Sequence, residues 1–267
     1  MKVSAIQFNV TDDKAANIAT IENLVGACVE RDAPDFVVLP EASAFLSADV
    51  AHLHALAEPI DGPYAQAMAG LAVRNNCVIH AGSIVERRGD RFYNTSQVFD
   101  RSGDLIGRYS KIHRFDVVLP DGTEMRESDI VDRGDEIVVI EVDGHKVGLS
   151  ICYDLRFSQL FHQLALRGAS IIVLPAAFTF QTGADHWEVL VRARAIETQC
   201  YVVAPNQIGT YGNGKYMNFA HSMIVDPWGM IIGQASNSEG WITATLDMGY
   251  LASVRSRLPV HQHHVLR

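Results

Sequence analysis

Short β-branched runs alternate with longer amphipathic stretches along most of this 267-residue chain. Segments 2–10, 36–40 and 170–178 are rich in Val, Ile and Leu, which is typical of buried strands. Segments 16–32 and 186–199 instead repeat apolar residues at helical spacing. Strands that alternate with helices in this way predict an α/β fold, in which helices cover a mixed sheet or two sheets.

Several neighbouring segments read as hairpins. We expect residues 93–100 to pair with residues 105–112, and residues 136–152 to turn back at Asp143-Gly144. Residues 113–136 are polar and irregular. No linker or repeat of fixed period interrupts the chain, so residues 1–267 are predicted to form a single domain. We expect its C-terminal extension, residues 250–267, to leave the core and pack on a partner subunit.

The chain is acidic and contains few cysteines. Its 22 basic and 31 acidic residues give a net charge of −9, which is not the electrostatic pattern of a protein that binds nucleic acid or an anionic membrane. No apolar run reaches the ~18 residues of a membrane span, and the N-terminus turns polar too soon for a signal peptide. We interpret the glycosylation sequon at Asn94 as a chance match. We expect the thiols to be reduced, in a cytoplasmic protein. The four cysteines are Cys28, Cys77, Cys152 and Cys200.

Three predicted strands end in residues of reactive type. The strand FVVLP leads to Glu41, IGRYS leads to Lys111, and KVGLSI leads to Cys152. Ligands of α/β proteins bind outside the carboxyl ends of strands, so these side chains are candidates for one pocket. A thiol that attacks a carbonyl carbon, a carboxylate that moves its proton and an ammonium that stabilises the oxyanion would together support acyl transfer.

The sequence around these residues resembles a known family. FVVLPEASAF around Glu41, GRYSKIH around Lys111 and GLSICYDLRF around Cys152 look like the signature blocks of the nitrilase superfamily of carbon–nitrogen hydrolases. The block EMRESD resembles the segment that carries the second glutamate of that family, here Glu127. The resemblance extends from Val3 to about residue 247.

The resemblance implies a role for each matching residue. Cys152 would be the nucleophile, and Glu41 would be the general base and then the acid for the leaving amine. Lys111 would stabilise the tetrahedral intermediate. Glu127 would orient Lys111 or the substrate, and could share proton transfer with Glu41. The backbone N–H of Tyr153 would complete the oxyanion hole. A helix beginning just beyond the nucleophile would favour the thiolate through its dipole.

The family fold is a four-layer αββα sandwich of two mixed sheets flanked by helices, and its members usually form homodimers. The resemblance implies no metal and no organic cofactor. Segments 186–204 and 221–229 look most like the deaminated glutathione amidase branch, with omega-amidases as similar neighbours. Those branches act on small anionic amides, so Arg156 is a candidate for the pocket rim and Phe178 for its wall. The glycine-rich stretch 205–219 departs from that branch and leaves the substrate open.

Other functions are compatible with single motifs. Cys152 could instead form a dyad with His186 or His221, and Ser150 lies in a near match to G-x-S-x-G. Residues 209–215 satisfy G-x-x-x-x-G-K, yet no Ser or Thr follows and no helix is expected there, so we reject a P-loop.

Two further alternatives concern binding without catalysis. His261, His263 and His264 cluster near the C-terminus, but no carboxylate or thiol completes a metal-ligand set there. A catalytically silent homologue that binds a protein partner is the rival from another class. Such a protein commonly loses a reactive side chain, whereas Glu41 and the other reactive positions are all retained here.

Overall fold

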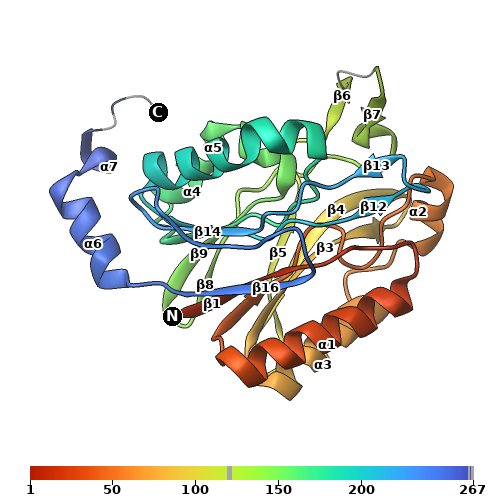
Figure 1. Ribbon diagram of the computed structural model, residues 1–267, viewed down its shortest axis with the longest axis horizontal. Helices are drawn as coiled ribbons and strands as arrows, with labels where there is room; N and C mark the ends of the chain where they lie inside the picture. Colours follow the sequence, from red (N-terminus) through yellow and green to blue (C-terminus); the bar gives the residue numbers. More distant parts are fainter. Residues whose placement is uncertain (119–121, 264, 266–267) are drawn as a thin grey trace.

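The chain folds into four layers in the computed structural model, which describes residues 1–118, 122–263 and 265. Two six-stranded sheets lie face to face in the middle. Helices α1 (Lys14–Asp32) and α3 (Pro63–Asn75) cover the outside of the first sheet. Helices α4 (Ser158–Leu166) and α5 (Phe180–Thr198) cover the outside of the second (Figure 1). This architecture confirms the predicted α/β sandwich of two mixed sheets flanked by helices.

The first sheet has the strand order β16-β1-β2-β3-β4-β5. The pairs β1–β2 and β2–β3 are parallel, and the other pairs are antiparallel. In chain order the strands are β1 (Lys2–Gln7), β2 (Phe36–Val38), β3 (Val78–Arg88), β4 (Arg91–Phe99), β5 (Leu105–Ser110) and β16 (Gly240–Thr245).

The second sheet repeats this pattern in the order β15-β14-β11-β10-β9-β8. The pairs β9–β10 and β10–β11 are parallel, and antiparallel strands lie on either side. The strands are β8 (Val139–Val142), β9 (His145–Leu149), β10 (Ile171–Val173), β11 (Tyr201–Ala204), β14 (Met223–Val225) and β15 (Ile231–Gln234). Each sheet therefore has a parallel core whose carboxyl ends can carry a site.

Alternation along the strands assigns side chains to two cores. Val3 and Ala5 of β1 point between the sheets and belong to one buried cluster with Val147 and Leu149 of β9. Ile6 lies in a separate cluster that joins the first sheet to α1 and α3. Because strands of both sheets are covered on both faces, they read as continuous apolar runs.

Several short elements were not predicted from the sequence. They are α2 (Val50–Leu56), the hairpin of β6 (Asp116–Val118) and β7 (Glu124–Arg126), and the hairpin of β12 (Thr210–Tyr211) and β13 (Tyr216–Met217). Residues 113–136, expected to be irregular, contain the β6–β7 hairpin. Helix α5 begins at Phe180, before the predicted residue 186. The helix expected just beyond the nucleophile begins at Ser158 and follows the 3₁₀ helix η2 (Cys152–Arg156).

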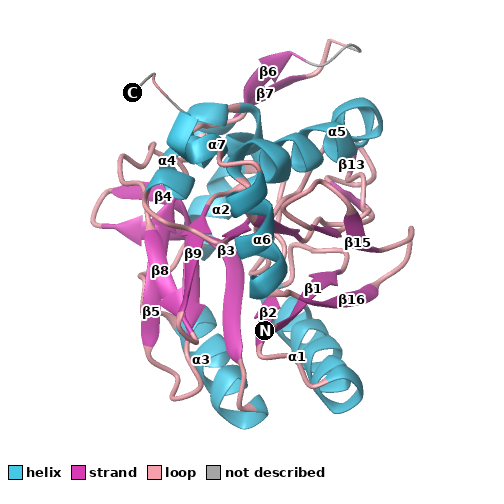
Figure 2. Ribbon diagram, turned by 90° about the vertical axis from the view of Figure 1, so that its left-hand side faces the viewer, coloured by secondary structure: helices cyan, strands magenta, loops and turns pink. Residues whose placement is uncertain are grey.

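The C-terminal extension is anchored to its own chain. Helix α6 (Met248–Arg257) buries Leu251 and Val254, and Arg255 donates to the carbonyls of Gln199 (3.0 Å) and Ala169 (2.8 Å). The expectation that this segment leaves the core is therefore wrong for α6, because its apolar face packs on the second half of the chain. Helix α7 (Val260–His263) continues along the edge of the molecule (Figures 1 and 2). Packing on a partner subunit stays a prediction.

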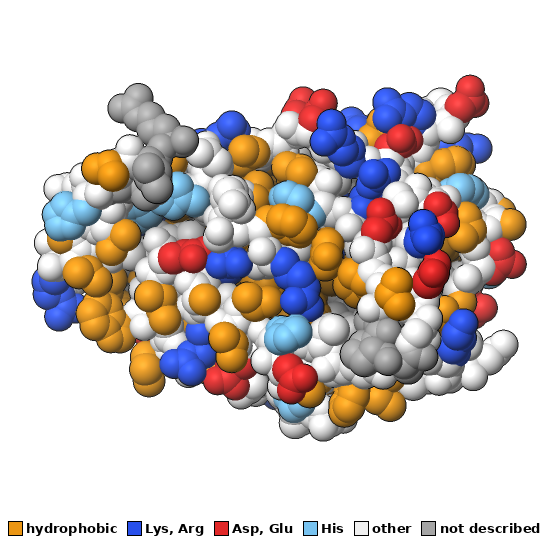
Figure 3. Space-filling view, turned by 90° about the horizontal axis from the view of Figure 1, so that it is seen from above, with side chains coloured by type: hydrophobic (Ala, Val, Ile, Leu, Met, Phe, Trp, Pro, Cys, Tyr) orange, Lys and Arg blue, Asp and Glu red, His pale blue; other side chains and the backbone are white. Residues whose placement is uncertain are grey.

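The helices and the upper face of the molecule bear on membrane and polyanion binding. Over the described ranges, none of the helices combines the length and apolar character that a membrane span needs. On the face that carries α4, α5 and the β6–β7 hairpin, basic and acidic side chains of the described residues are interspersed with apolar ones (Figure 3).

Candidate active site

The four residues expected to react line one cavity of about 550 Å³. Glu41 follows β2, and Lys111 follows β5 in the same sheet. Cys152 follows β9 of the second sheet and begins η2. Glu127 begins the 3₁₀ helix η1 (Glu127–Asp129) directly after β7. The cavity thus draws reactive side chains from the ends of strands in both sheets.

Lys111 is held between the two carboxylates. Its ammonium Nζ lies 2.9 Å from Glu41 Oε1, and 3.0 and 2.8 Å from the two carboxylate oxygens of Glu127. The Lys111 side chain is only 2% exposed. Burial opposes its charge, but the neighbouring Glu127 and Glu41 carboxylates raise the pKa of Lys111 well above its ordinary value. The lysine therefore stays an ammonium at neutral pH.

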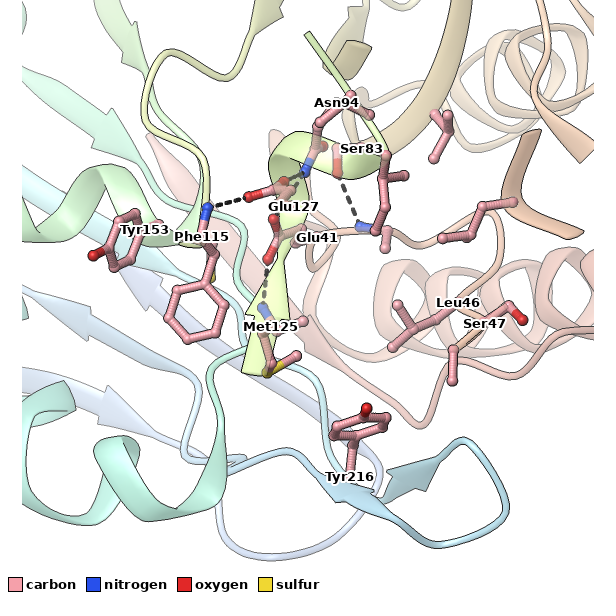
Figure 4. A pocket seen from close by; sticks show the side chains of 18 of the residues that line it. Glu41, Leu46, Ser47, Ser83, Asn94, Phe115, Met125, Glu127, Tyr153 and Tyr216 are labelled. Carbon is pink, nitrogen blue, oxygen red and sulfur yellow. Dashed lines mark hydrogen bonds between the residues drawn. The ribbon is translucent and has the colours of Figure 1, made fainter. Parts of the chain in front are cut away.

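A fifth polar side chain joins this cluster and was not recognised from the sequence. Asn94 Nδ2 donates to Glu41 Oε1 (2.9 Å) and to Glu127 Oε1 (3.0 Å). Backbone N–H groups also contribute, from Phe115 to Glu127 Oε2 (2.6 Å) and from Ala177 to Glu41 Oε2 (3.0 Å). Figure 4 shows Asn94 and the two glutamates converging on one wall of the cavity. The sequon asparagine is thus part of the site.

The backbone at the nucleophile position is unusual. Cys152 has φ = 44°, a left-handed conformation that non-glycine residues adopt only where the surroundings enforce it. Its N–H donates to the carbonyl of Pro175 (2.9 Å), and the preceding Ile151 N–H donates to the buried carboxylate of Asp154 (2.8 Å). Tyr109 also donates its hydroxyl to Asp154, at 2.7 Å. This turn aims the thiol into the cavity instead of along the strand.

The protonation state of the thiol differs from the expected one. Burial and the negative charge of Glu41 raise the pKa of Cys152 well above its ordinary value, and the opposing effect of Lys111 is smaller. The expectation that a helix dipole favours the thiolate is therefore wrong. Only the short η2 begins at this residue, and the first full turn of α4 starts at Ser158. A thiol in this state needs a base before it can attack.

Two of the three candidate substrate-binding residues line the cavity, and the third does not. Tyr153 and Phe178 line the cavity, as expected. Arg156 does not line it, because its guanidinium lies over the ring of Phe178, 5.2 Å from the centroid, and contacts His186 Nδ1 at 3.3 Å. Arg126 of β7 lies on the cavity wall and was not a candidate.

The competing constellations do not assemble around the thiol. His186 contacts Arg156, and His221 Nδ1 lies 3.3 Å from the carbonyl of Ala235. Ser150 is fully buried and donates its hydroxyl to the carbonyl of Val173 at 2.8 Å. Residues 209–215 belong to the β12–β13 hairpin, so no helix follows the P-loop-like motif.

The histidines near the C-terminus are separate from the cavity. His261 Nε2 lies 2.8 Å from the carbonyl of Thr198, and His263 is exposed. His264 falls outside the described residues.

The fold and the site define a class of protein: an αββα sandwich whose cavity presents a thiol, two carboxylates and an ammonium for chemistry at a carbonyl carbon. The carbon–nitrogen hydrolase family model matches residues 2–256. The chain belongs to the carbon–nitrogen hydrolase family, within the nitrilase superfamily, as the sequence blocks indicated.

Individual relatives agree with this assignment. The deaminated glutathione amidase of Bos taurus is 37% identical over 273 residues, which cover 98% of this chain and 81% of that protein. The deaminated glutathione amidase of Synechocystis sp. is 37% identical over 267 residues, covering 98% and 97%.

Solved structures share the fold. The Caenorhabditis elegans NitFhit protein superposes with a TM-score of 0.90 at 32% identity, and the match covers 98% of this chain and 64% of that longer one. Saccharomyces cerevisiae Nit3, a member of branch 10 of the nitrilase superfamily, superposes with a TM-score of 0.88 at 29% identity and covers 97% and 94%.

Proposed function

We propose that this chain hydrolyses the C–N bond of a small, linear, anionic amide through a thioester on Cys152. The observation that carries the proposal is the shared cavity, in which the thiol lies with the Lys111 ammonium and the carboxylates of Glu41 and Glu127. Relatives named deaminated glutathione amidases support a substrate of that kind.

The first half-reaction begins with proton transfer from the thiol. Glu41 Oε1 already accepts from Lys111 and Asn94, whereas Oε2 accepts the N–H of Ala177, and the Glu41 side chain is hydrogen-bonded to the Cys152 thiol. A lone pair on Oε2 therefore remains for the proton of Cys152. The sulfur then forms a bond to the amide carbon, and the carbonyl oxygen becomes an oxyanion.

The oxyanion is stabilised by the Lys111 ammonium and the N–H of Tyr153. The N–H of Cys152 is not available for this role, because it donates to Pro175. Collapse breaks the C–N bond, and the proton held by Glu41 passes to the leaving amine. Water then attacks the thioester while Glu41 takes its proton. The C–S bond breaks, Glu41 returns that proton to the sulfur to restore the thiol, and the carboxylic acid leaves.

The cavity walls favour a substrate with an apolar stem and a negative end. Tyr153 and Phe178 offer aromatic faces. Lys111 is occupied by two carboxylates, so Arg126 is the better candidate to meet a substrate carboxylate. Its partner Glu124, 3.1 Å from Arg126 Nε, is as exposed as Arg126 itself, and such a surface pair contributes little.

We also propose a cytoplasmic homodimer. All four cysteines are free, which suits a reducing compartment. Ile196 of α5 is half-exposed and lies close to Gly229 in the β14–β15 turn, whose sequence neighbours Trp228 and Met230 are also exposed; these apolar side chains would be covered in a dimer. Light scattering of the purified protein measures the mass directly, and a monomer at micromolar concentration would contradict the dimer.

The deciding experiment is a mass-spectrometric turnover screen of the purified protein. The panel contains deaminated glutathione, 2-oxoglutaramate, N-carbamoyl amino acids, aliphatic amides and nitriles, so that the other branches of the family are alternative outcomes. We expect the anionic amides to be hydrolysed, Cys152→Ala to fold but show no turnover, and the matched variant Cys200→Ala to retain it. Turnover by Cys152→Ala above background would overturn the nucleophile assignment.

A further inference from the structure

Asn94 is fixed beside the reactive cluster by the pairing of two strands. It lies on β4, and its carbonyl accepts the backbone N–H of Lys111 at 2.8 Å, just beyond β5. The register pairs the next residue, Thr95, with Ser110. The side chain of Asn94 is therefore held next to that of Lys111 by the sheet itself, before any side-chain contact forms.

The amide has a single productive orientation. Its nitrogen has two hydrogens, and two carboxylate oxygens lie within 3.0 Å of it, one from Glu41 and one from Glu127. Its oxygen Oδ1 is buried and has no hydrogen-bond partner among the described residues. A flipped amide would place that oxygen against both carboxylates, and the repulsion excludes it.

We propose that Asn94 is a positioning residue that keeps the Glu41–Glu127 pair ionised and apart, so that Glu41 can act as the base. The proposal rests on the proposed function of this site. Two carboxylates and one ammonium leave one net negative charge in a largely buried cluster. Each N–H of Asn94 stabilises the ionised form of one carboxylate, because hydrogen bonds to a charged form favour that form. Without these bonds, the pair would take up a proton more readily and Glu41 would be unable to accept one from the thiol.

The titratable groups around Glu41 determine in which direction the pH profile of kcat/KM should shift. They are Lys111 after β5, Glu127 of η1, Cys152 of η2 and Tyr211 of β12. Lys111 remains charged over the working range, and the thiol and the phenol remain neutral because burial raises both of their pKa values. Losing the two Asn94 donors should move the acidic limb of the kcat/KM profile to higher pH.

The test compares Asn94→Ala, Asn94→Asp and the wild type. Asn94→Asp keeps the shape of the side chain but replaces the donor with a third carboxylate. We expect the acidic limb to move up by about one pH unit in Asn94→Ala and further in Asn94→Asp. We expect kcat at neutral pH to fall at least about tenfold, with KM changing less. Asn237→Asp, in an exposed loop, adds the same charge away from the site and should keep the wild-type profile.

A second readout does not depend on turnover. The rate at which iodoacetamide alkylates Cys152 follows the thiolate fraction, and Cys152→Ala gives the background from the other cysteines. The added charge in Asn94→Asp should shift this alkylation profile to higher pH. If the wild type hydrolyses nothing in the panel, the proposed function fails, and the alkylation profile still tests the role of Asn94.

Thermal unfolding shows whether each variant is folded in the assay. If Asn94→Asp does not fold, the pH profile of Asn94→Ala decides. Folded variants that lose activity equally at every pH, with unshifted profiles, would overturn the proposal and leave Asn94 a structural role only.

Discussion

Acid sensitivity of the fold can be predicted from His80, a buried histidine of β3. The residue has no exposed surface, its Nδ1 accepts the N–H of Gly82 at 3.2 Å, and its Nε2 has no partner among the described residues. Burial lowers the pKa of His80 to about 3, against about 6.5 in an unfolded chain. Its backbone carbonyl accepts the N–H of Leu39, two residues before Glu41, so this strand also supports the site.

The sign of the effect follows from proton uptake. Between pH 6.5 and 3, the unfolded chain binds a proton at His80 and the folded chain does not, so the free energy of unfolding falls as the pH falls. The slope is about 1.4 kcal/mol per pH unit, which gives roughly 3 kcal/mol lost by pH 4.5 and on the order of 5 kcal/mol by pH 3. Above pH 6.5 the residue contributes no pH dependence.

The perturbation is His80→Asn, which offers an acceptor oxygen for Gly82 but does not titrate. Its smaller volume should cost about 1–2 kcal/mol at pH 7.5. Urea denaturation of both proteins at pH 7.5, 5.5 and 4.5 gives the comparison, because all other titrating groups are shared. We expect the variant to be the less stable protein at pH 7.5 and the more stable one at pH 4.5. Parallel stability curves would refute the reasoning.

Four further substitutions test the site. Lys111→Met should destabilise the fold by about 3–5 kcal/mol by leaving two carboxylates uncompensated. Adding Glu127→Gln to Lys111→Met removes one of those carboxylates. In urea denaturation, the double variant should be more stable than the sum of the two single changes predicts, by a coupling energy of about 1–3 kcal/mol. Strictly additive free energies would contradict an interaction between Lys111 and Glu127. Asp154→Asn should cost about 2–3 kcal/mol and slow Cys152 alkylation, because the turn at the nucleophile loses acceptors; an unchanged alkylation rate would argue against this support. Arg126→Gln should raise KM for anionic amides at least about fivefold and leave neutral amides unaffected, and an equal change for both would exclude it as the anion contact.

The sequence pattern predicted an α/β fold and the reactive strand ends because those features are local, whereas the arrangement of the strands in two packed sheets was implied only by the resemblance to the family. Glu41, Lys111 and Cys152 each follow a continuous apolar run, and such runs identify buried strands. Glu127 lies in a polar segment without periodicity, and only its resemblance to the family block singled it out. Short elements such as α2 and the β12–β13 hairpin carry too few residues to show a period.

What the sequence could not predict depends on tertiary contacts. Asn94 resembles any polar residue on a strand until the sheet register places it beside Lys111. The expected thiolate was wrong because the burial of Cys152, which raises its pKa, arises only when the second sheet packs against the first. Arg156 follows the nucleophile closely, yet it stacks over Phe178, outside the cavity wall.

Because the cavity takes its reactive residues from both sheets, enzymatic activity requires the two halves of the fold to be docked. Glu41 and Lys111 come from the first sheet, whereas Cys152 comes from the second. A refolding intermediate with both sheets formed but not yet docked would have native secondary structure and no catalytic power. During refolding, recovery of turnover should therefore lag behind recovery of the circular dichroism signal. The delay would measure the time that the two sheets need to dock.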